Sequence, residues 1–184
     1  MKLLLATTVV AATFSSACAF APLAADVLAP FKAGKALKII SGLDRFDSEL
    51  VTKVARAAEL GGASCVDVAC RPDLVTAARA AAPTTPVCVS AVDPSLFPAC
   101  VEAGAAMVEL GNFDAFYEKG ITFSAADVLD MTRRTRQLLP TTPLSVTVPH
   151  TLHLDEQVSL AQELEAAGAD ILQTEGKYSL SPQK

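Results

Sequence analysis

The sequence has few of the groups that several common kinds of site require. Its 184 residues include no tryptophan and two histidines, and aromatic residues make up 5 % of the chain. The chain has fifteen basic and twenty acidic residues, and the basic residues form no stripe that would neutralise nucleic acid phosphates. We therefore expect no nucleic acid partner. No G-x-G-x-x-G pattern follows the first expected strand, so a dinucleotide fingerprint is missing too.

Cysteine and histidine spacing predicts no metal centre. None of the five cysteines forms a C-x-x-C pair, and the two histidines are not spaced for a zinc site. Cys65 and Cys88 lie inside apolar, strand-like runs, which favours buried free thiols, as we expect also for Cys70 and Cys100. The composition identifies no cofactor. With 51 % hydrophobic and 19 % charged residues, the chain is expected to fold around a core.

The first residues look like a targeting signal. A positive start, an apolar run over 3–14 and small residues up to Ala19 predict a signal peptide over residues 1–19. The run is too short to span a membrane, so we expect no membrane segment in the mature form. Phe20 at the junction resembles the bipartite presequence of algae with complex plastids. Residues 20–36 are then a segment like a plastid transit peptide, although they lack the usual serine and arginine richness. Plain secretion is the alternative.

The remaining chain, residues 37–184, alternates strands and helices. The expected strands are short apolar runs: Leu37–Leu43, Cys65–Cys70, Val87–Val92, Met107–Gly111, Leu144–Pro149 and Ile171–Glu175. Helix start signals stand between them: Asp47, Pro72, Asp93-Pro94, a capping box from Ser124 to Asp127, and Leu154-Asp155. On the helix after Ser124, we expect Arg133, Arg134 and Arg136 to form a solvated face.

An internal repeat favours a particular architecture. A Gly-Ala pair leads into the second, fourth and sixth expected strands, beginning at Gly62, Gly104 and Gly168. Each glycine is placed to end a helix in a left-handed conformation. Alternating strands and helices predict a parallel sheet, and the repeat favours an α/β, (β/α)₈ TIM-barrel type over an open doubly wound sheet.

The count of elements falls short of a closed barrel. We find about six strands and five helices, where a (β/α)₈ barrel has eight of each. The fold class is therefore an incomplete TIM barrel. Two explanations remain open. The chain is a truncated product or gene model, or another chain covers the open barrel edge.

Five segments carry a family resemblance: Ile40–Leu43, Cys88–Pro94, Val108–Glu118, Leu144–Leu152 and Leu172–Gly176. They resemble the hypothetical chloroplast open reading frame 23 family of algal plastid genomes and cyanobacteria, over about residues 35–181. The resemblance implies a plastid protein with a fold similar to phosphate-binding, aldolase-type barrels. It also implies a glycine-rich C-terminal portion that is missing here, and with the leader it implies a nucleus-encoded, truncated chain. It assigns no catalytic residue.

Polar residues are expected to meet at the carboxyl ends of the strands, where such barrels place their active sites. As catalytic candidates we take Glu109, Glu175 and His150, because two carboxylates and an imidazole can exchange protons. The ligand-binding candidates are hydroxyl, amide and acidic residues: Ser41, Asp67, Ser90, Asn112, Thr147 and Gln173. Alternatively, Asp67 and Glu109 only cap neighbouring backbone groups or pair with Arg71 or Lys38. The aromatic stretch 112–123 is either a lid over a ligand or a packed loop.

Two functions remain open. The first is an enzyme-like barrel in the chloroplast stroma that binds a small phosphorylated or carboxylated metabolite at the strand ends. The second is a non-catalytic plastid barrel that senses a metabolite or holds a partner. Strand-end acids and a histidine exceed what a scaffold needs, which favours the first function. The substrate, reaction and cofactor are not readable from the residues.

Overall fold

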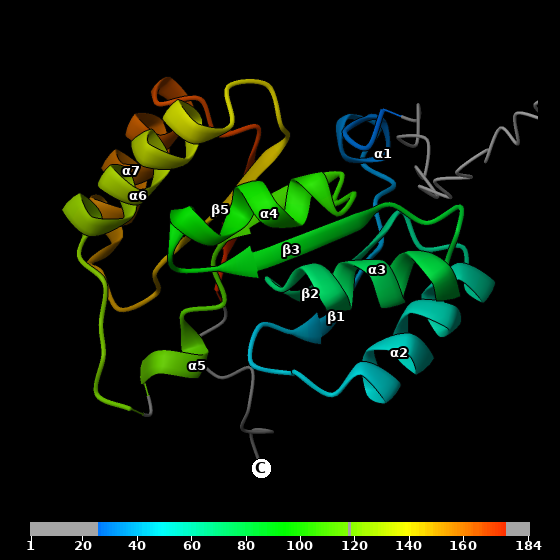
Figure 1. The fold of residues 1–184 in the computed structure, drawn as a ribbon. Coiled ribbons are helices and arrows are strands. Elements are labelled where there is room, and N and C mark those ends of the chain that lie inside the picture. Colours follow the sequence, from blue (N-terminus) through cyan, green and yellow to red (C-terminus); the bar gives the residue numbers. More distant parts are fainter. Residues whose placement is uncertain (1–25, 118, 176–184) are drawn as a thin grey trace, which may run out of the picture.

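A computed structural model describes residues 26–117 and 119–175 (Figure 1). Six strands form a single sheet in the order of the chain, and every neighbouring pair is parallel. The strands are β1 (Lys38–Gly42), β2 (Cys65–Ala69), β3 (Val87–Ala91), β4 (Met107–Leu110), β5 (Leu144–Val148) and β6 (Ile171–Thr174). Each lies within the range expected from its apolar run. The parallel order confirms the incomplete barrel that the repeat predicted.

Helices connect the strands and cover one face of the sheet (Figure 1). They are α2 (Ser48–Leu60), α3 (Pro72–Ala81), a 3₁₀ turn η1 (Pro94–Leu96) leading into α4 (Phe97–Glu102), α6 (Ala125–Leu138) and α7 (Leu154–Ala166). Two one-turn helices, α1 (Ala29–Lys32) and α5 (Asp114–Tyr117), were not expected. Among the described residues, no helix has both the length and the apolarity needed to cross a membrane.

The start and stop signals of the helices act as predicted. The Asp47 carboxylate accepts hydrogen bonds from the amides of Glu49 and Leu50, at 2.9 and 3.3 Å, and so caps α2. Ser124 and Asp127 form a reciprocal capping box at the start of α6. The three repeat glycines adopt positive φ angles, from 70° at Gly62 to 104° at Gly104, where a side chain would be strained.

The expectation for Arg136 is wrong. Its guanidinium donates to the carbonyls of Gly168 and Thr142 at 2.8 and 2.6 Å, and it forms an ion pair with Asp170. Arg136 therefore ties α6 to the starts of β5 and β6 instead of lying free in solvent. A helical pattern does not show this, because the partners are carbonyl groups of distant loops.

Alternating residues of each strand give the sheet two different faces. Valines and leucines of β2 to β5 point outward and join one large core under the helices. On the inner face, Cys65, Cys88 and Met107 form a second cluster with Val27, to which Phe31 of the α1 region adds. The packed fold thus includes residues from Val27 onward. Residues 1–19, the predicted signal peptide, lie outside the described residues, and both this signal peptide and the transit-like segment over 20–36 stay predictions.

Candidate active site on the inner face of the sheet

The register of the sheet brings polar side chains together on its inner face. Glu109 of β4 pairs with Ser90 of β3 and with Ser145 of β5, and Thr147 of β5 pairs with Gln173 of β6. Residues paired in this way share a face of the sheet. Ser90, Glu109, Ser145 and Thr147 are all at most 1 % exposed. A buried polar layer therefore lines the interior of the half-barrel.

Lys38 is the charged partner at the centre of this layer. Its ammonium group donates to the Glu109 carboxylate and, at 2.9 Å, to the Gln173 side-chain oxygen. Burial is the largest single influence on the pKa of Lys38 and lowers it, but the charges of Glu109, Cys88 and Asp67 together with the hydrogen bond to Glu109 outweigh burial and raise that pKa above its usual value. Lys38 is thus a protonated cation that links β1, β4 and β6. Pairing with Lys38 was one of the two readings of Glu109 that the sequence left open.

Asp67 forms a second group with Ser90 and Asn112. The Ser90 hydroxyl donates to Asp67 at 2.6 Å, and the Asn112 amide lies 3.5 Å from the other carboxylate oxygen. Burial raises the pKa of the Asp67 carboxyl, and the charge of Glu109 raises it further. Asn112 takes a positive φ of 58°, so the chain turns sharply after β4. Asp67 can therefore hold a proton at a pH where an exposed aspartate would be ionised.

His150 and Glu175 meet in a third group, beyond the ends of β5 and β6. One Glu175 oxygen accepts from the His150 amide at 3.0 Å and from the Tyr117 hydroxyl at 2.9 Å, and it lies 3.1 Å from His150 Nδ1. The Asp114 carboxylate is 3.6 Å from the same ring nitrogen. The Tyr117 ring packs edge-on against the His150 ring, with centroids 5.1 Å apart.

Several buried oxygens have no hydrogen-bond partner within the described part of the chain. They belong to Ser41, Glu109, Ser145, Thr147 and Glu175. A buried polar atom without a partner costs about 1–3 kcal/mol, so native proteins rarely retain one without a ligand, a water molecule or a functional reason. Glu109, Ser145 and Thr147 lie on the inner face, Glu175 follows β6, and Ser41 lies where the register of β1 is irregular, between Ile40 and Gly42. The unpartnered oxygens therefore make this interior the candidate binding region.

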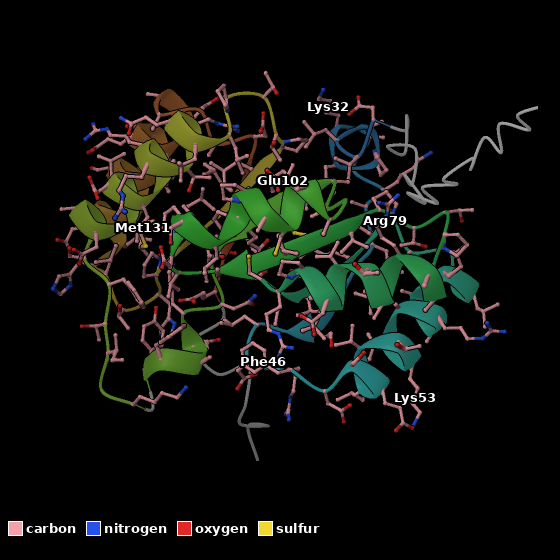
Figure 2. The ribbon with its side chains drawn as sticks, in the orientation of Figure 1. Lys32, Phe46, Lys53, Arg79, Glu102 and Met131 are labelled. Carbon is pink, nitrogen blue, oxygen red and sulfur yellow. The ribbon has the colours of Figure 1, made fainter. Side chains whose placement is uncertain are left out.

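A hollow opens at the carboxyl ends of β1 to β3, beside the polar layer. Its volume is about 170 Å³. Ser90 reaches its wall, and the rest is mostly apolar, including Leu43, Val92, Leu96 and Phe116. An apolar wall with a few polar groups is the usual form of a small-molecule site. Figure 2 shows the side chains around this end of the sheet, near Phe46.

The structure brings most of the sequence candidates together, but into separate groups. Of the catalytic candidates, Glu175 and His150 are in contact, whereas Glu109 belongs to the Lys38 group. Asp67, Ser90 and Asn112 form a group, and Gln173 joins Glu109 through Lys38. Among the described residues, the hydroxyls of Ser41 and Thr147 have no hydrogen-bond partner, so these two side chains join none of the three groups. Whether these residues act in binding or catalysis stays a prediction.

Sequence reasoning missed three contributors: Asp114, Tyr117 and Ser145. Ser145 could have been found from strand alternation, since it stands two residues before Thr147 on the same strand. Asp114 and Tyr117 lie on α5, inside the aromatic stretch, where no spacing rule points to them. Phe113 is fully buried and its ring lies 4.6 Å from that of Phe123, so part of this stretch is a packed loop.

The four described cysteines are free and buried, as predicted. Cys70 and Cys100 lie close, with their sulfur atoms 3.4 Å apart. Burial raises the pKa of Cys65 to about 12 and that of Cys88 well above its usual value. These two thiols are therefore unreactive packing groups.

Two related proteins of known sequence come from algae. The chain is 47 % identical over 148 residues to the ycf23 protein of Cyanophora paradoxa, which covers 80 % of this chain and 61 % of that protein. It is 37 % identical over 155 residues to ycf23 of Pyropia yezoensis, covering 84 % of this chain and 56 % of the relative. The chain thus spans a little over half the length of these relatives. Such homologues are encoded in algal plastid genomes.

Two solved structures with a similar fold are described as aldolases. One described as "QR15, an Aldolase" has a TM-score of 0.59 at 18 % identity, covering 80 % of this chain and 70 % of its own. A putative deoxyribose-phosphate aldolase from Coccidioides immitis has a TM-score of 0.58 at 20 % identity, covering 81 % and 61 %. At these identities the likeness shows the TIM-barrel fold alone.

A family model matches residues 23–184, which is most of the chain. Its description is "Protein of unknown function (DUF561)". Together with the identities to the algal proteins, this match confirms the resemblance on which the plastid reading depends. The chain belongs to the DUF561 family and is a homologue of the plastid-encoded ycf23 proteins.

Proposed function

We propose that this chain is part of a plastid barrel enzyme. The enzyme binds a small carboxylated or phosphorylated metabolite and catalyses the transfer of a proton to or from that metabolite. The observation that carries the proposal is the buried polar layer of the inner face, with its unpartnered Glu109, Ser145 and Thr147 oxygens. A scaffold gains nothing from burying these groups, because apolar residues of similar volume would stabilise it as well or better. A ligand that hydrogen-bonds to them would offset their desolvation.

Glu109 is the proposed acid/base. Lys38 contacts one of its oxygens, while Oε1 has no hydrogen-bond partner among the described residues and is placed to accept a proton. Ser90 on the neighbouring strand β3 and Asp67 on β2 would hold the ligand through a proton that Asp67 keeps near neutral pH. The raised pKa of Lys38 argues against the nucleophilic amine of a Schiff-base mechanism.

Localisation is part of the proposal. Plastid-encoded relatives support a plastid role, and a signal peptide over 1–19 followed by a transit-like segment would carry a nucleus-encoded copy to the stroma. A fluorescent protein fused after residue 36 tests this in an alga with complex plastids. Fluorescence confined to the plastid supports the proposal, and secretion into the medium contradicts it. A fusion that lacks residues 1–19 is the control and should stay in the cytosol.

Solvent exchange tests proton transfer without knowledge of the full reaction. The protein is incubated in D₂O with small carbonyl compounds, pyruvate and dihydroxyacetone phosphate, and proton NMR follows deuterium entering the carbon next to the carbonyl. We expect exchange with at least one of them, and a loss of about 100-fold or more in Glu109→Gln. Asp130→Asn, on the outside of α6, is the matched control and should exchange like the wild type. Exchange unchanged in Glu109→Gln would remove Glu109 from the mechanism.

The exposed edges favour a second candidate, a non-catalytic barrel held by a partner. Leu37 and Ile40 beside and within β1 are 50 and 46 % exposed, and Leu172 of β6 is 39 % exposed. Such apolar strand edges are usually covered by another segment or chain. This candidate predicts a stable stoichiometric complex from plastid stroma and no exchange in the NMR experiment. Replacing Ile40 by lysine should weaken that complex, whereas replacing the exposed Leu154 of α7 should not.

A further inference from the structure

We propose that Asp114, His150 and Glu175 form a binding site for one divalent cation of the Zn²⁺ or Mn²⁺ kind. Each residue offers one ligand atom, and these three atoms all lie within 4.8 Å of one another. The residues follow three successive strands of the sheet: Asp114 opens α5 after β4, His150 follows β5 and Glu175 follows β6. The site therefore lies at the carboxyl edge of the sheet, where barrel enzymes place their chemistry.

The distances suit a coordination shell. His150 Nδ1 lies 3.1 Å from Glu175 Oε2 and 3.6 Å from Asp114 Oδ1. Two ligand atoms that are each about 2.1 Å from one metal stand roughly 3.0–3.4 Å apart at tetrahedral or octahedral angles. The Asp114 and Glu175 ligand atoms lie within 4.8 Å of each other, so a side-chain movement of up to about 1.4 Å would bring this third pair to the spacing of a coordination shell. The backbone after each of the three strands already places the ligands.

Glu175 supplies an observation independent of the clustering. Its side chain is 5 % exposed, and its Oε1 atom accepts no hydrogen bond within the described residues. A buried carboxylate is costly to keep ionised without a paired positive charge. A divalent cation beside Glu175 would supply that charge and could use the unpartnered oxygen as a second ligand atom.

Tyr117 acts as the outer support of the site. Its hydroxyl donates to Glu175 Oε2 at 2.9 Å, and its ring packs against the His150 ring. Groups that orient metal ligands in this way commonly alter the affinity by about 10–100-fold. One imidazole and two carboxylates suit Zn²⁺, a borderline cation, and also Mn²⁺, a harder cation that favours oxygen ligands. Three protein ligands also leave positions for water or a ligand oxygen, as catalytic sites do.

Calorimetric titration of the chelator-treated full chain with ZnCl₂, and separately with MnCl₂, tests the site. We expect one equivalent of at least one metal to bind. His150→Asn and Glu175→Gln should each weaken that binding by about 100-fold or more, and Tyr117→Phe by about 10-fold. His153→Asn is the matched control, because His153 is the other histidine of the chain, is exposed and lies three residues away. Its affinity should equal that of the wild type.

Three results would overturn the site. The first is the absence of saturable binding of either metal, which would make the cluster an ordinary ion pair of His150 with its two carboxylates. The second is binding that survives both His150→Asn and Asp114→Asn. The third is binding that His153→Asn abolishes. Asp114, whose side chain is 35 % exposed, decides the matter if Glu175→Gln does not fold by circular dichroism. The titration needs no substrate, so its outcome is separate from that of the exchange experiment.

Discussion

The two faces of the central strands are equally buried and chemically opposite. Val108 and Leu110 of β4 point outward into the apolar core, and Glu109 between them points inward, yet all three are 0 % exposed. Burial of an apolar side chain stabilises the fold by about 1.5–3 kcal/mol, whereas a buried charge costs free energy unless it is paired. The outer face therefore stabilises the fold, whereas the buried polar groups of the inner face lower its stability.

Removing the cation of the inner face should have the largest effect. Lys38→Met leaves the Glu109 carboxylate buried without its partner, so we expect the free energy of unfolding to fall by about 3–5 kcal/mol in urea denaturation. The double variant Lys38→Met/Glu109→Gln removes both charges and should recover most of that loss. A double variant as unstable as Lys38→Met would mean that Lys38 stabilises the sheet by packing and that the inner face is not electrostatically costly.

Truncating the outer face should come next. Leu110→Ala deletes fully buried methyl groups from the core under the helices and should lower the free energy of unfolding by about 2–5 kcal/mol, with no rescue by a second substitution on the inner face. Leu154, which is 73 % exposed on α7, gives the matched control. Leu154→Ala should change stability by less than about 0.5 kcal/mol. Equal effects at the two leucines would contradict the assignment of the outer core.

A substitution where β4 ends tests how tightly the inner face is packed. A Cβ atom at Gly111 would lie 2.1 Å from Thr147 Oγ1 and 3.0 Å from Thr147 Cβ. Gly111→Ala should therefore cost about 1–3 kcal/mol through overpacking. Gly111→Ala/Thr147→Ala removes the hydroxyl that clashes and should restore part of the stability. Thermal unfolding followed by circular dichroism measures both, and an undisturbed Gly111→Ala would show that this part of the interior is loose.

The outer face was the easier one to predict from the sequence. Apolar runs such as Cys65–Ala69, with glycines and caps between them, carry enough information for strand limits, the parallel order and the barrel type. These signals are local or repeat along the chain. The packing of Val27 under Cys88 was missed because the segment resembles a presequence in composition, and composition alone cannot show a tertiary contact.

The inner face could be predicted only in part. Strand alternation places Asp67, Glu109 and Gln173 on the inner face, where the structure also has them, while their role in binding or catalysis stays a prediction. Their grouping depends on side-chain reach and on pairs far apart in the chain, such as Lys38 with Glu109, 71 residues away. Asp114 and Tyr117 are placed beside His150 by the one-turn helix α5, which is too short to give a periodic pattern in the sequence. Site geometry therefore needed the fold, whereas the fold itself needed only local patterns.

The pH dependence of stability tests the charge balance of the inner face. Burial raises the pKa of Asp67 to about 7 in the folded state, above the value of about 3.9 in an unfolded chain. The folded protein then binds the proton more tightly, so the contribution of this group is complete below about pH 4 and is lost as the pH rises toward 7. Asp67→Asn removes that loss. The stability of Asp67→Asn relative to the wild type should therefore increase between pH 4 and pH 7.

Asp73 offers a control of opposite sign. It is an exposed first-turn residue of α3 whose hydrogen bond from Arg71 lowers its pKa, so its contribution is present at neutral pH and is lost as the pH falls through the carboxylate range. Asp73→Asn should therefore lose a little stability relative to the wild type as the pH rises from about 3 to 5. Urea unfolding across this pH series separates the two variants. Parallel curves for Asp67→Asn and the wild type would mean that Asp67 is ionised in the fold, and that the inner face is better compensated than its contacts indicate.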